Sequence, residues 1–380
     1  MIPLHISTAK DTDEWNAIVD QNPYSVLYHR YELCASSPND FPLIIEEGGQ
    51  CFLLPLKITK LFKAFTLATT PVHYYTSLLP DVEALDLTPR VLEGLVTFLR
   101  KIGVFYLSTC APTFFSKDYA AILTSWFRKH GATIQVFYAQ MIQIRGKTFE
   151  EIWKRFKRRS REEIRKAERE GVEVIKIDNV EGIEKWIDDI YRCNVSALLR
   201  QGRWGGYPDS YKDVYLSELL AWKKLLKEHF NIYGAIFRGR LIAYIIVQEY
   251  NKLMKPTKAY SQTNFLRKHP NDVLVTHLVK EACERGFEWF DYGFDRVRRG
   301  EKIPSLYPGI QLWRSKFRFK EIPIPVYRLG LTRSGKIMQH VYSSREYIVT
   351  RSAYIPESIR DFLAKLYAPR RRKFSPIIYT

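Results

Sequence analysis

Short apolar runs alternate with longer amphipathic stretches along most of the chain. In the longer stretches apolar residues recur at spacings of three and four, which predicts helices with one buried face. The predicted helices cover residues 11–21, 87–103, 118–131, 148–171, 181–200, 217–229 and 271–286. The short runs are rich in β-branched and aromatic residues, which is typical of strands. The predicted strands cover 42–47, 51–58, 104–109, 133–144, 172–177, 232–237, 241–250, 258–263, 287–293 and 326–331.

Turn and capping residues define the limits of some of these elements. Gly48-Gly49 separates two apolar runs, which predicts a tight hairpin. Thr148 and Glu151 have the spacing of a capping box, and Gly171 is suited to end a helix. One continuous helix is therefore expected from residue 148 to residue 171.

The two halves of the chain share a similar order of elements, which suggests a tandem duplication of one fold. A length of 380 residues also favours two domains. We place these domains at residues 1–145 and 146–330. Residues 331–380 carry 10 Lys or Arg and 3 acidic residues, and we assign them to a basic, Tyr- and Arg-rich C-terminal extension.

The positive charge is concentrated in one part of the chain. The formal net charge is +18, yet residues 1–145 hold 12 basic and 13 acidic residues. All of the excess therefore lies beyond residue 145. Such a surface attracts anionic ligands such as RNA, a phosphorylated cofactor or an anionic membrane surface. The alternative is a basic face that only keeps the protein in solution.

Several classes of protein lack support in the sequence. The five cysteines form no CxxC pair and are expected to be reduced, and the eight histidines form no HExxH motif, so we expect no metal site. Serine-hydrolase, P-loop and dinucleotide-binding motifs are also absent. There is no signal-like N-terminus and no apolar run long enough for a transmembrane segment. These features predict a cytoplasmic protein.

The densest basic run lies within the predicted helix 148–171. Between Lys154 and Arg169 there are nine basic and three acidic residues. Apolar residues, among them Ile152, Trp153 and Ile164, recur at helical spacing through the same segment. One face of the helix is therefore expected to be buried and the other strongly positive. This pattern indicates a helix entering a folded domain and not a disordered basic arm.

At this point the sequence resembles a known group. The Trp-containing helix, the run Arg161–Ala167 and the following Gly-Val-x-Val look like the start of the second domain of FemAB-type aminoacyl transferases. They are equally similar to the related BioF-like branch of the GNAT acyltransferase superfamily. Further similar stretches follow in the same order: Gly239–Tyr244, Ala259–Ser261, Pro270–Ala282, Phe290–Gly293 and Gly309–Phe317. The first half agrees more loosely, through Trp15, Tyr28-His29, Leu54–Leu56 and Tyr74-Tyr75.

The resemblance implies two tandem GNAT-like domains, with mixed sheets flanked by helices, and an N-acyltransferase activity. Such enzymes hold an amine acceptor near an acyl carbonyl and stabilise the oxyanion, so they need no covalent nucleophile. Arg314 stands where the family has a signature lysine, and Lys316 follows two residues later. Tyr260 and Asp291 are candidates for orienting the amine or accepting its proton. The alternatives are a surface arginine on a loop, ordinary packing for Tyr260 and a capping role for Asp291.

Other residues are candidates for binding the two substrates. Arg200, Arg203 and Trp204 belong to a glycine-rich loop suited to an anionic or planar ligand, unless the loop is only a flexible surface segment. Trp313 precedes Arg314 and is a further substrate-binding candidate. Phosphates of the donor or of RNA would be bound by residues of the basic helix and of the segment before residue 270, namely Arg158, Arg161, Arg165, Arg267 and Lys268.

The donor is either an aminoacyl-tRNA or an acyl-CoA, and no covalently bound cofactor is expected. The acetyl-CoA enzymes of the resembled superfamily carry glycines before the donor-binding helix, where backbone amides bind the pyrophosphate. This chain has Arg267–Asp272 there, without glycine and with Pro270. An aminoacyl-tRNA is therefore the preferred donor, and a non-catalytic RNA-binding protein of the same fold is the competing hypothesis. A cell-wall precursor as acceptor is disfavoured, because Cys34–Ser37 lacks the lysine that the wall-building members would use.

Overall fold

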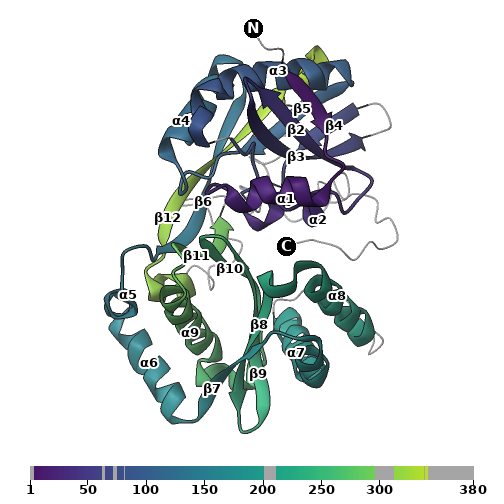
Figure 1. The fold of residues 1–380 in the computed structure, drawn as a ribbon. Helices are drawn as coiled ribbons and strands as arrows, with labels where there is room; N and C mark the ends of the chain where they lie inside the picture. The colour runs from purple at the N-terminus through teal and green to yellow at the C-terminus, as the bar shows by residue number, and fades with distance from the viewer. Residues whose placement is uncertain are drawn as a thin grey trace, which may run out of the picture.

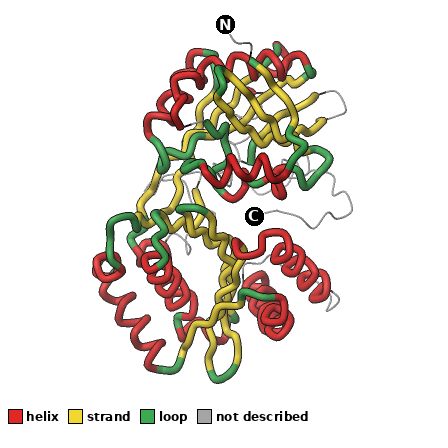
Figure 2. Tube along the Cα trace, viewed as in Figure 1, coloured by secondary structure: helices red, strands yellow, loops and turns green. Residues whose placement is uncertain are grey.

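A computed structural model describes residues 4–61, 65–71, 75–80, 82–200, 211–295, 312–337 and 339–340. Within these residues the chain forms an α/β structure with helices on both sides of a large mixed sheet (Figures 1 and 2). This confirms the predicted fold class. Most of the predicted extension, residues 341–380, lies outside the described part of the chain. No described helix is both long and apolar enough to cross a bilayer.

In the described part of the chain, twelve strands form a single sheet in the order β1-β2-β3-β4-β5-β12-β6-β11-β10-β9-β8-β7. In chain order they are β1 (His5–Thr8), β2 (Asp40–Glu47), β3 (Gln50–Leu61), β4 (Phe65–Thr69), β5 (Val104–Cys110), β6 (Thr133–Gln143), β7 (Val172–Ile177), β8 (Phe230–Phe237), β9 (Arg240–Tyr250), β10 (Leu253–Ser261), β11 (Trp289–Asp295) and β12 (Lys320–Gly330). The β2–β3 hairpin turns at Gly48-Gly49, as predicted, and both glycines have positive φ.

Helices cover both faces of this sheet. They are α1 (Thr12–Gln21), α2 (Tyr31–Cys34), α3 (Thr88–Lys101), α4 (Lys117–Lys129), α5 (Phe149–Arg155), α6 (Arg158–Arg169), α7 (Val180–Arg200), α8 (Tyr211–Leu226) and α9 (Pro270–Glu284). In the first half, α3 and α4 pack together, with α3 against β5 and α4 against β12. In the second half, α9 packs on β8 and β9 together with α5 and α6, whereas α7 and α8 pack on the opposite face (Figure 1).

The two halves of the chain share strands. β12 is antiparallel to both β5 and β6, and β6 is also antiparallel to β11, so the sheet continues from one half to the other. One apolar cluster also joins them, because Trp15 of α1 belongs to the same cluster as Ile183 and Tyr215 of the second half. The predicted limits of the domains, 1–145 and 146–330, stay a prediction. What the structure adds is that β12, assigned to the second domain, lies between β5 and β6, which both belong to the first half.

The predicted helix 148–171 is wrong in one respect, because it is broken into α5 and α6. Its capping box and its glycine stop are present as predicted. At Phe156 and Lys157 the backbone is extended, and the Phe156 ring packs against Phe317 at 5.0 Å between ring centroids. The Lys157 amide donates to the Lys316 carbonyl at 2.9 Å instead of continuing the helix. A long-range contact therefore overrides the local helical pattern.

A buried histidine makes the stability of the fold pH-dependent. His29 is fully buried; its Nδ1 accepts from the Val26 amide at 2.9 Å, and its Nε2 lies 3.1 Å from the Ser77 carbonyl. Burial lowers the pKa of His29 to about 4. Since the folded protein binds this proton less readily than the unfolded chain does, stability is complete above the ordinary pKa of about 6.5 and falls as the pH drops towards 4.

We expect this single group to remove about 3 kcal/mol of unfolding free energy between pH 7 and pH 4. The measurement is urea denaturation across that range for the wild type, His29→Asn and His340→Asn. Asparagine keeps an acceptor for the Val26 amide but does not titrate, so the His29 variant should be less stable at pH 7 and show a flatter pH profile. The exposed His340 is the matched control, and an equal slope in all three proteins would contradict the prediction.

Candidate functional site

Two parallel strands separate in the middle of the sheet. β10 and β11 pair only through Leu253 with Trp289 and Met254 with Phe290. Beyond this point β10 follows β9, and β11 follows β6, each with an irregularity in its register. Paired strands hydrogen-bond to each other through their backbone groups. Where β10 and β11 separate, these groups need other partners, and side chains or a ligand can lie between the strands.

A buried ion pair lies where the strands begin to separate. Lys255 Nζ of β10 is 3.0 Å from Asp291 Oδ2 of β11, and the two residues are 8% and 0% exposed. The other carboxylate oxygen of Asp291 accepts from the Gly293 amide at 3.0 Å. Burying both charges is costly unless the geometry is good, so this pair is a strongly constrained feature of the site. Sequence reasoning identified Asp291 but missed Lys255.

The first half of the chain supplies a third member of this site. The Tyr75 ring lies 4.1 Å from Lys255 Nζ, in the geometry of a cation–π contact. Burial raises the pKa of the Tyr75 hydroxyl well above its ordinary value, and the Asp291 carboxylate raises it further. The hydroxyl therefore stays protonated at neutral pH. Residues from both halves thus meet at one polar centre.

Arg314 is the fourth member. Its Nη2 donates to the Tyr292 carbonyl at 3.0 Å, and the residue is only 8% exposed. The neighbouring Gly293 has φ +83°, and a Cβ there would lie 3.6 Å from Arg314 Nη2. Burial excludes the alternative of a surface arginine on a loop. We name Tyr75, Lys255, Asp291 and Arg314 the junction cluster.

A second network occupies the N-terminus of α9. The buried Asp272 carboxylate accepts from Trp313 Nε1, lies 2.8 Å from Lys316 Nζ and lies 3.5 Å from His269 Nδ1. Lys316 Nζ is also 3.1 Å from the Glu163 carboxylate. Burial opposes ionisation of Asp272, but the hydrogen bonds from His269, Lys316 and Trp313 outweigh it and lower the pKa of Asp272.

This network gives Lys316 a fixed positive charge. Burial disfavours the ammonium, yet Asp272 and Glu163 together raise the pKa of Lys316 above its ordinary value. An ammonium with a raised pKa is better suited to hold a negatively charged group in place than to transfer a proton. The same carboxylates and His269 offer three ligand atoms within 4.8 Å of one another, a spacing that could hold a metal ion. The Lys316 ammonium already pairs with both carboxylates and supplies the cation there.

Tyr260 lies apart from the junction cluster. It is five residues beyond Lys255 on β10, or about 17 Å along the strand. Its ring lies 5.7 Å from that of Tyr244, whose hydroxyl is 2.6 Å from the hydroxyl of Tyr215. Tyr260 therefore packs with residues on the α7–α8 side of the sheet. Its proposed role in catalysis stays a prediction.

The remaining substrate-binding candidates are only partly described. Arg200 ends α7 and donates to the Ser261 carbonyl at 3.3 Å and to Thr263 Oγ1 at 2.9 Å, which ties α7 to the end of β10. Arg203 and Trp204 lie outside the described residues. Trp313 lies against Tyr292, with 4.9 Å between ring centroids, so it packs beside Arg314 as well as contacting Asp272.

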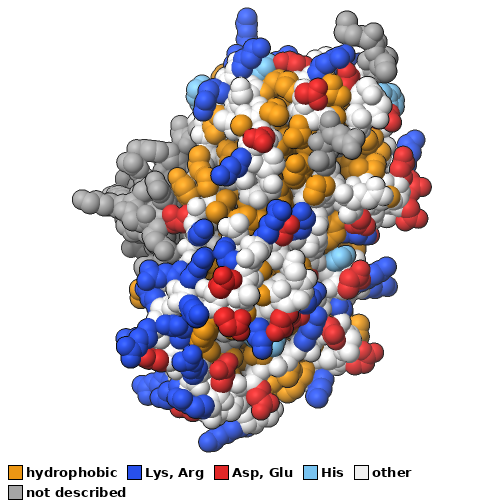
Figure 3. All heavy atoms as spheres, turned by 60° about the vertical axis from the view of Figure 1, so that its left-hand side comes forward, with side chains coloured by type: hydrophobic (Ala, Val, Ile, Leu, Met, Phe, Trp, Pro, Cys, Tyr) orange, Lys and Arg blue, Asp and Glu red, His pale blue; other side chains and the backbone are white. Residues whose placement is uncertain are grey.

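The basic candidates lie on α6 and just before α9. Arg158 and Arg165 are exposed, although Arg158 pairs with Glu162 at 2.8 Å and Arg165 lies 5.7 Å above Trp153. Arg267 is exposed, and Lys268 pairs with Glu170 at the end of α6 at 2.7 Å. Arg161 is half-buried. Figure 3 shows many Lys and Arg side chains over the lower half of the molecule, with acidic side chains between them.

Comparisons with known proteins bear on the fold of the chain. Residues 154–297 match the family model described as acetyltransferase (GNAT) domain. A search of the curated proteins gives no match. Among solved structures, the FemX crystal structure has a TM-score of 0.64 at 11% identity and covers 86% of this chain and 97% of that chain.

Two further structures share the fold. The C-terminal domain of a putative lysylphosphatidylglycerol synthetase from Agrobacterium fabrum has a TM-score of 0.53 at 13% identity, covering 89% of this chain and 97% of that one. The L-PGS structure from Bacillus licheniformis has a TM-score of 0.54 at 12% identity, covering 90% and 96%. At these identities the similarity concerns the fold alone.

Proposed function

We propose that this chain is a GNAT-type acyltransferase that transfers an aminoacyl group from a charged tRNA to an amine, and the match of residues 154–297 to the acetyltransferase (GNAT) domain model supports the acyltransferase part of this proposal. The observation that carries the choice of donor is the network at the N-terminus of α9. A free helix N-terminus favours a bound pyrophosphate, because backbone amides and the helix dipole face it. Here the buried Asp272 carboxylate occupies the first turn, and it shares the single Lys316 ammonium with Glu163, so no positive charge is left over for that anion.

The basic surface supports a polyanionic donor. Arg158 and Arg165 on α6 and Arg267 before α9 are exposed on neighbouring elements, since α6 packs against α9. Contacts from such side chains to phosphates position RNA without reading its sequence. Coenzyme A is much smaller than tRNA, so it can contact only a small part of this basic surface and would gain little binding affinity from the rest.

The junction cluster supplies the groups that acyl transfer to an amine requires. The amine nitrogen attacks the acyl carbonyl, the C–O bond to the tRNA breaks, and the proton that the amine loses ends on the departing tRNA oxygen, which leaves as a hydroxyl. Arg314 has a permanent charge and several N–H donors, so it suits the oxyanion of the tetrahedral intermediate. The Asp291 carboxylate is suited to bind the amine as its ammonium form before attack. It is also suited to accept the proton that the amine loses. Lys255 holds Asp291 in place.

The test compares two donors on the same protein. Binding of aminoacyl-tRNA and of acetyl-CoA is measured at several salt concentrations, and transfer to a panel of amines is followed with each donor. We expect tRNA binding that weakens steeply with salt, and transfer from charged tRNA. Arg165→Glu should weaken tRNA binding and reduce the salt slope by about 1, whereas Lys10→Glu, an exposed change in the first half, should not.

The other outcomes separate the competing hypotheses. Tight binding of acetyl-CoA with transfer independent of tRNA would overturn the proposed donor and make this an acyl-CoA-dependent enzyme. Binding of tRNA without transfer to any amine would favour an RNA-binding protein that keeps the fold.

A further inference from the structure

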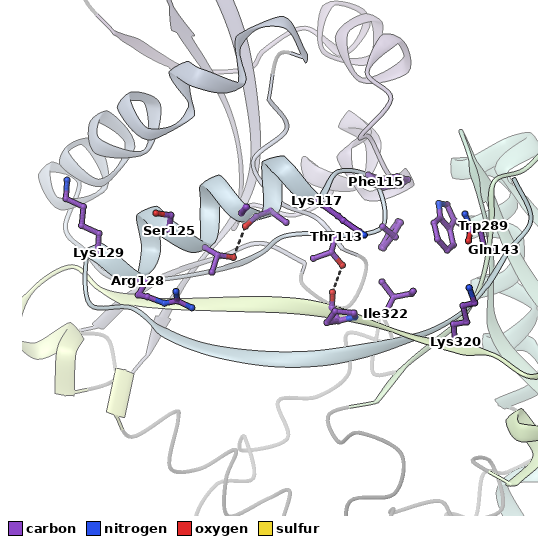
Figure 4. A pocket seen from close by; sticks show the side chains of 15 residues that line it. Thr113, Phe115, Lys117, Ser125, Arg128, Lys129, Gln143, Trp289, Lys320 and Ile322 are labelled. Carbon is purple, nitrogen blue, oxygen red and sulfur yellow. Dashed lines mark hydrogen bonds between the residues drawn. The ribbon is translucent and has the colours of Figure 1, made fainter.

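A large groove lies on the α4 side of the molecule. Its volume is about 1100 Å³. One wall of the groove is α4. The other walls are formed by the loop after β5, by β12, by the start of β11 and by the end of β6 (Figure 4). Thr113 donates to the Pro323 carbonyl, which fastens that loop to β12. The groove plays no part in the function proposed above.

The charged residues lining the groove are all cations. Lys117 and Lys320 lie towards the end that contains Trp289, and Arg128 and Lys129 lie at the other end (Figure 4). All four are exposed, and none forms an ion pair with a described residue. No Asp or Glu is among the described lining residues. The groove therefore favours a ligand with negative charge.

The stretch between the two ends is mostly apolar. Ala120, Ala121 and Thr124 of α4 face Ile322 and Pro323 of β12 across the groove. Small side chains on the helix leave room for a slender ligand to lie close to it. Lys117 and Lys129 are twelve residues apart, so the trough runs for about 18 Å along the helix axis. Such a shape fits an extended, unbranched apolar chain.

The two ends are not equivalent for an anion. α4 begins at Lys117, so the partial positive charge of the helix N-terminus adds to that of the lysines there. Lys117 and Lys320 also come from opposite walls. At the far end the helix C-terminus opposes an anion, and the long stems of Arg128 and Lys129 can cover an apolar tail while their charges reach water.

We propose that this groove binds a single-chain amphiphile: an anionic carboxylate or phosphate head between Lys117 and Lys320, and an aliphatic tail along α4. Charge complementarity excludes the chain's own basic segment Pro369–Lys373 as the occupant. The groove is recessed and about as long as one extended tail, so the committed occupant is a monomeric amphiphile and not a bilayer surface.

The head end of the groove is close to the junction cluster. Trp289 contacts Phe114 at 6.0 Å between ring centroids, and Phe114 contacts Tyr75 at 5.1 Å. Tyr75 in turn lies against Lys255. One continuous layer of aromatic rings therefore separates the proposed head site from the buried ion pair.

The experiment is titration calorimetry on the full chain with dodecyl phosphate and dodecanoate below their micelle concentrations. Dodecyl maltoside tests the same tail with a neutral head, and inorganic phosphate tests the head alone. We expect both anionic amphiphiles to bind with one site per chain and at least tenfold more tightly than either control compound. The measurement is of binding alone, so it can fail or succeed independently of acyl transfer.

Three variants locate the site. Lys117→Glu with Lys320→Glu should weaken binding of dodecyl phosphate at least tenfold, and Ala121→Trp should abolish it by filling the trough. Lys101→Glu, an exposed change at the end of α3, is the matched control and should leave binding unchanged. Equal affinity for dodecyl maltoside, full binding to the Ala121 variant, or binding only to anionic phospholipid vesicles would each overturn the proposal. Displacement of the bound amphiphile by a short single-stranded RNA would also overturn it, in favour of a nucleic-acid site.

Discussion

Replacing Lys255 by methionine is expected to lower the free energy of unfolding by about 3–5 kcal/mol, because it leaves the Asp291 carboxylate buried without its counter-ion. Asp291 is 0% exposed, and the Lys255 ammonium is 3.0 Å from its carboxylate. The change also removes the contact between the ammonium and the Tyr75 ring, which joins the two halves of the chain. Guanidinium denaturation of the wild type and the variant at pH 7 measures the loss.

Lys258→Met is the matched control for this loss. Lys258 lies three residues further along the same strand, and burial lowers the pKa of its ammonium, so its charge gains little from its surroundings. Its removal should cost far less. In the double variant Lys255→Met with Asp291→Asn, the buried charge is gone and the amide oxygen can still accept from Gly293. Most of the stability should return, giving a large coupling energy between the two positions. A Lys255 variant as stable as the Lys258 variant would contradict the prediction.

The elements with a strong local signal could be predicted from the sequence. The glycine pair at 48–49 fixes a hairpin, and Thr148 with Glu151 begins a helix at the predicted residue. Helices α3, α4, α7 and α9 follow the spacing of their apolar residues closely. The short strands β1 and β4 escaped prediction, since His5–Thr8 and Phe65–Thr69 are too short to show a clear alternation.

The site was only half predictable, because it depends on contacts between distant segments. Asp291 and Arg314 were identified from local resemblance, and the structure brings both into the junction cluster. Lys255 gave no signal, since a lysine in a strand next to Pro256 is typical of an exposed position. Its burial follows from the irregular register of β10 and from the way β11 diverges from it. Tyr75 comes from the other half, so no local pattern could place it there.

The basic run also shows why local patterns mislead. Its apolar spacing continues through Phe156, and the sequence alone favours one long helix. The structure instead turns the Phe156 ring towards Phe317, about 160 residues away in the chain, and divides the run between α5 and α6. Three basic residues of this run, Arg158, Arg159 and Lys166, pair with acidic neighbours four residues on, so the net positive field is smaller than the count of basic residues implies. Of these three, only Arg158 was predicted to contact phosphate.

Replacing Arg314 by glutamine should lower the rate of acyl transfer by a factor of about 10²–10³ with little change in KM, because it removes the donor proposed for the oxyanion. That factor is typical for removing one preorganised donor that acts mainly in the transition state. Arg314 is held by the Tyr292 carbonyl and lies beside Gly293, so its position is fixed before substrate arrives. Arg314→Lys keeps the charge but loses the forked set of donors, and it should recover only part of the rate.

A structural role for Arg314 predicts a different result. Loss of packing alone would lower the melting temperature and reduce activity in proportion to the folded fraction. The Arg314→Lys and Arg314→Gln variants would then have similar activities. The exposed Arg318, four residues on, is the control, and Arg318→Gln should leave both the rate and the stability unchanged. The expected signature is a large fall in kcat for Arg314→Gln, an intermediate kcat for Arg314→Lys, and similar folding of both variants at the assay temperature. A fall confined to KM would place Arg314 in ground-state binding and remove it from the chemical step, because an interaction made equally with substrate and transition state does not change kcat.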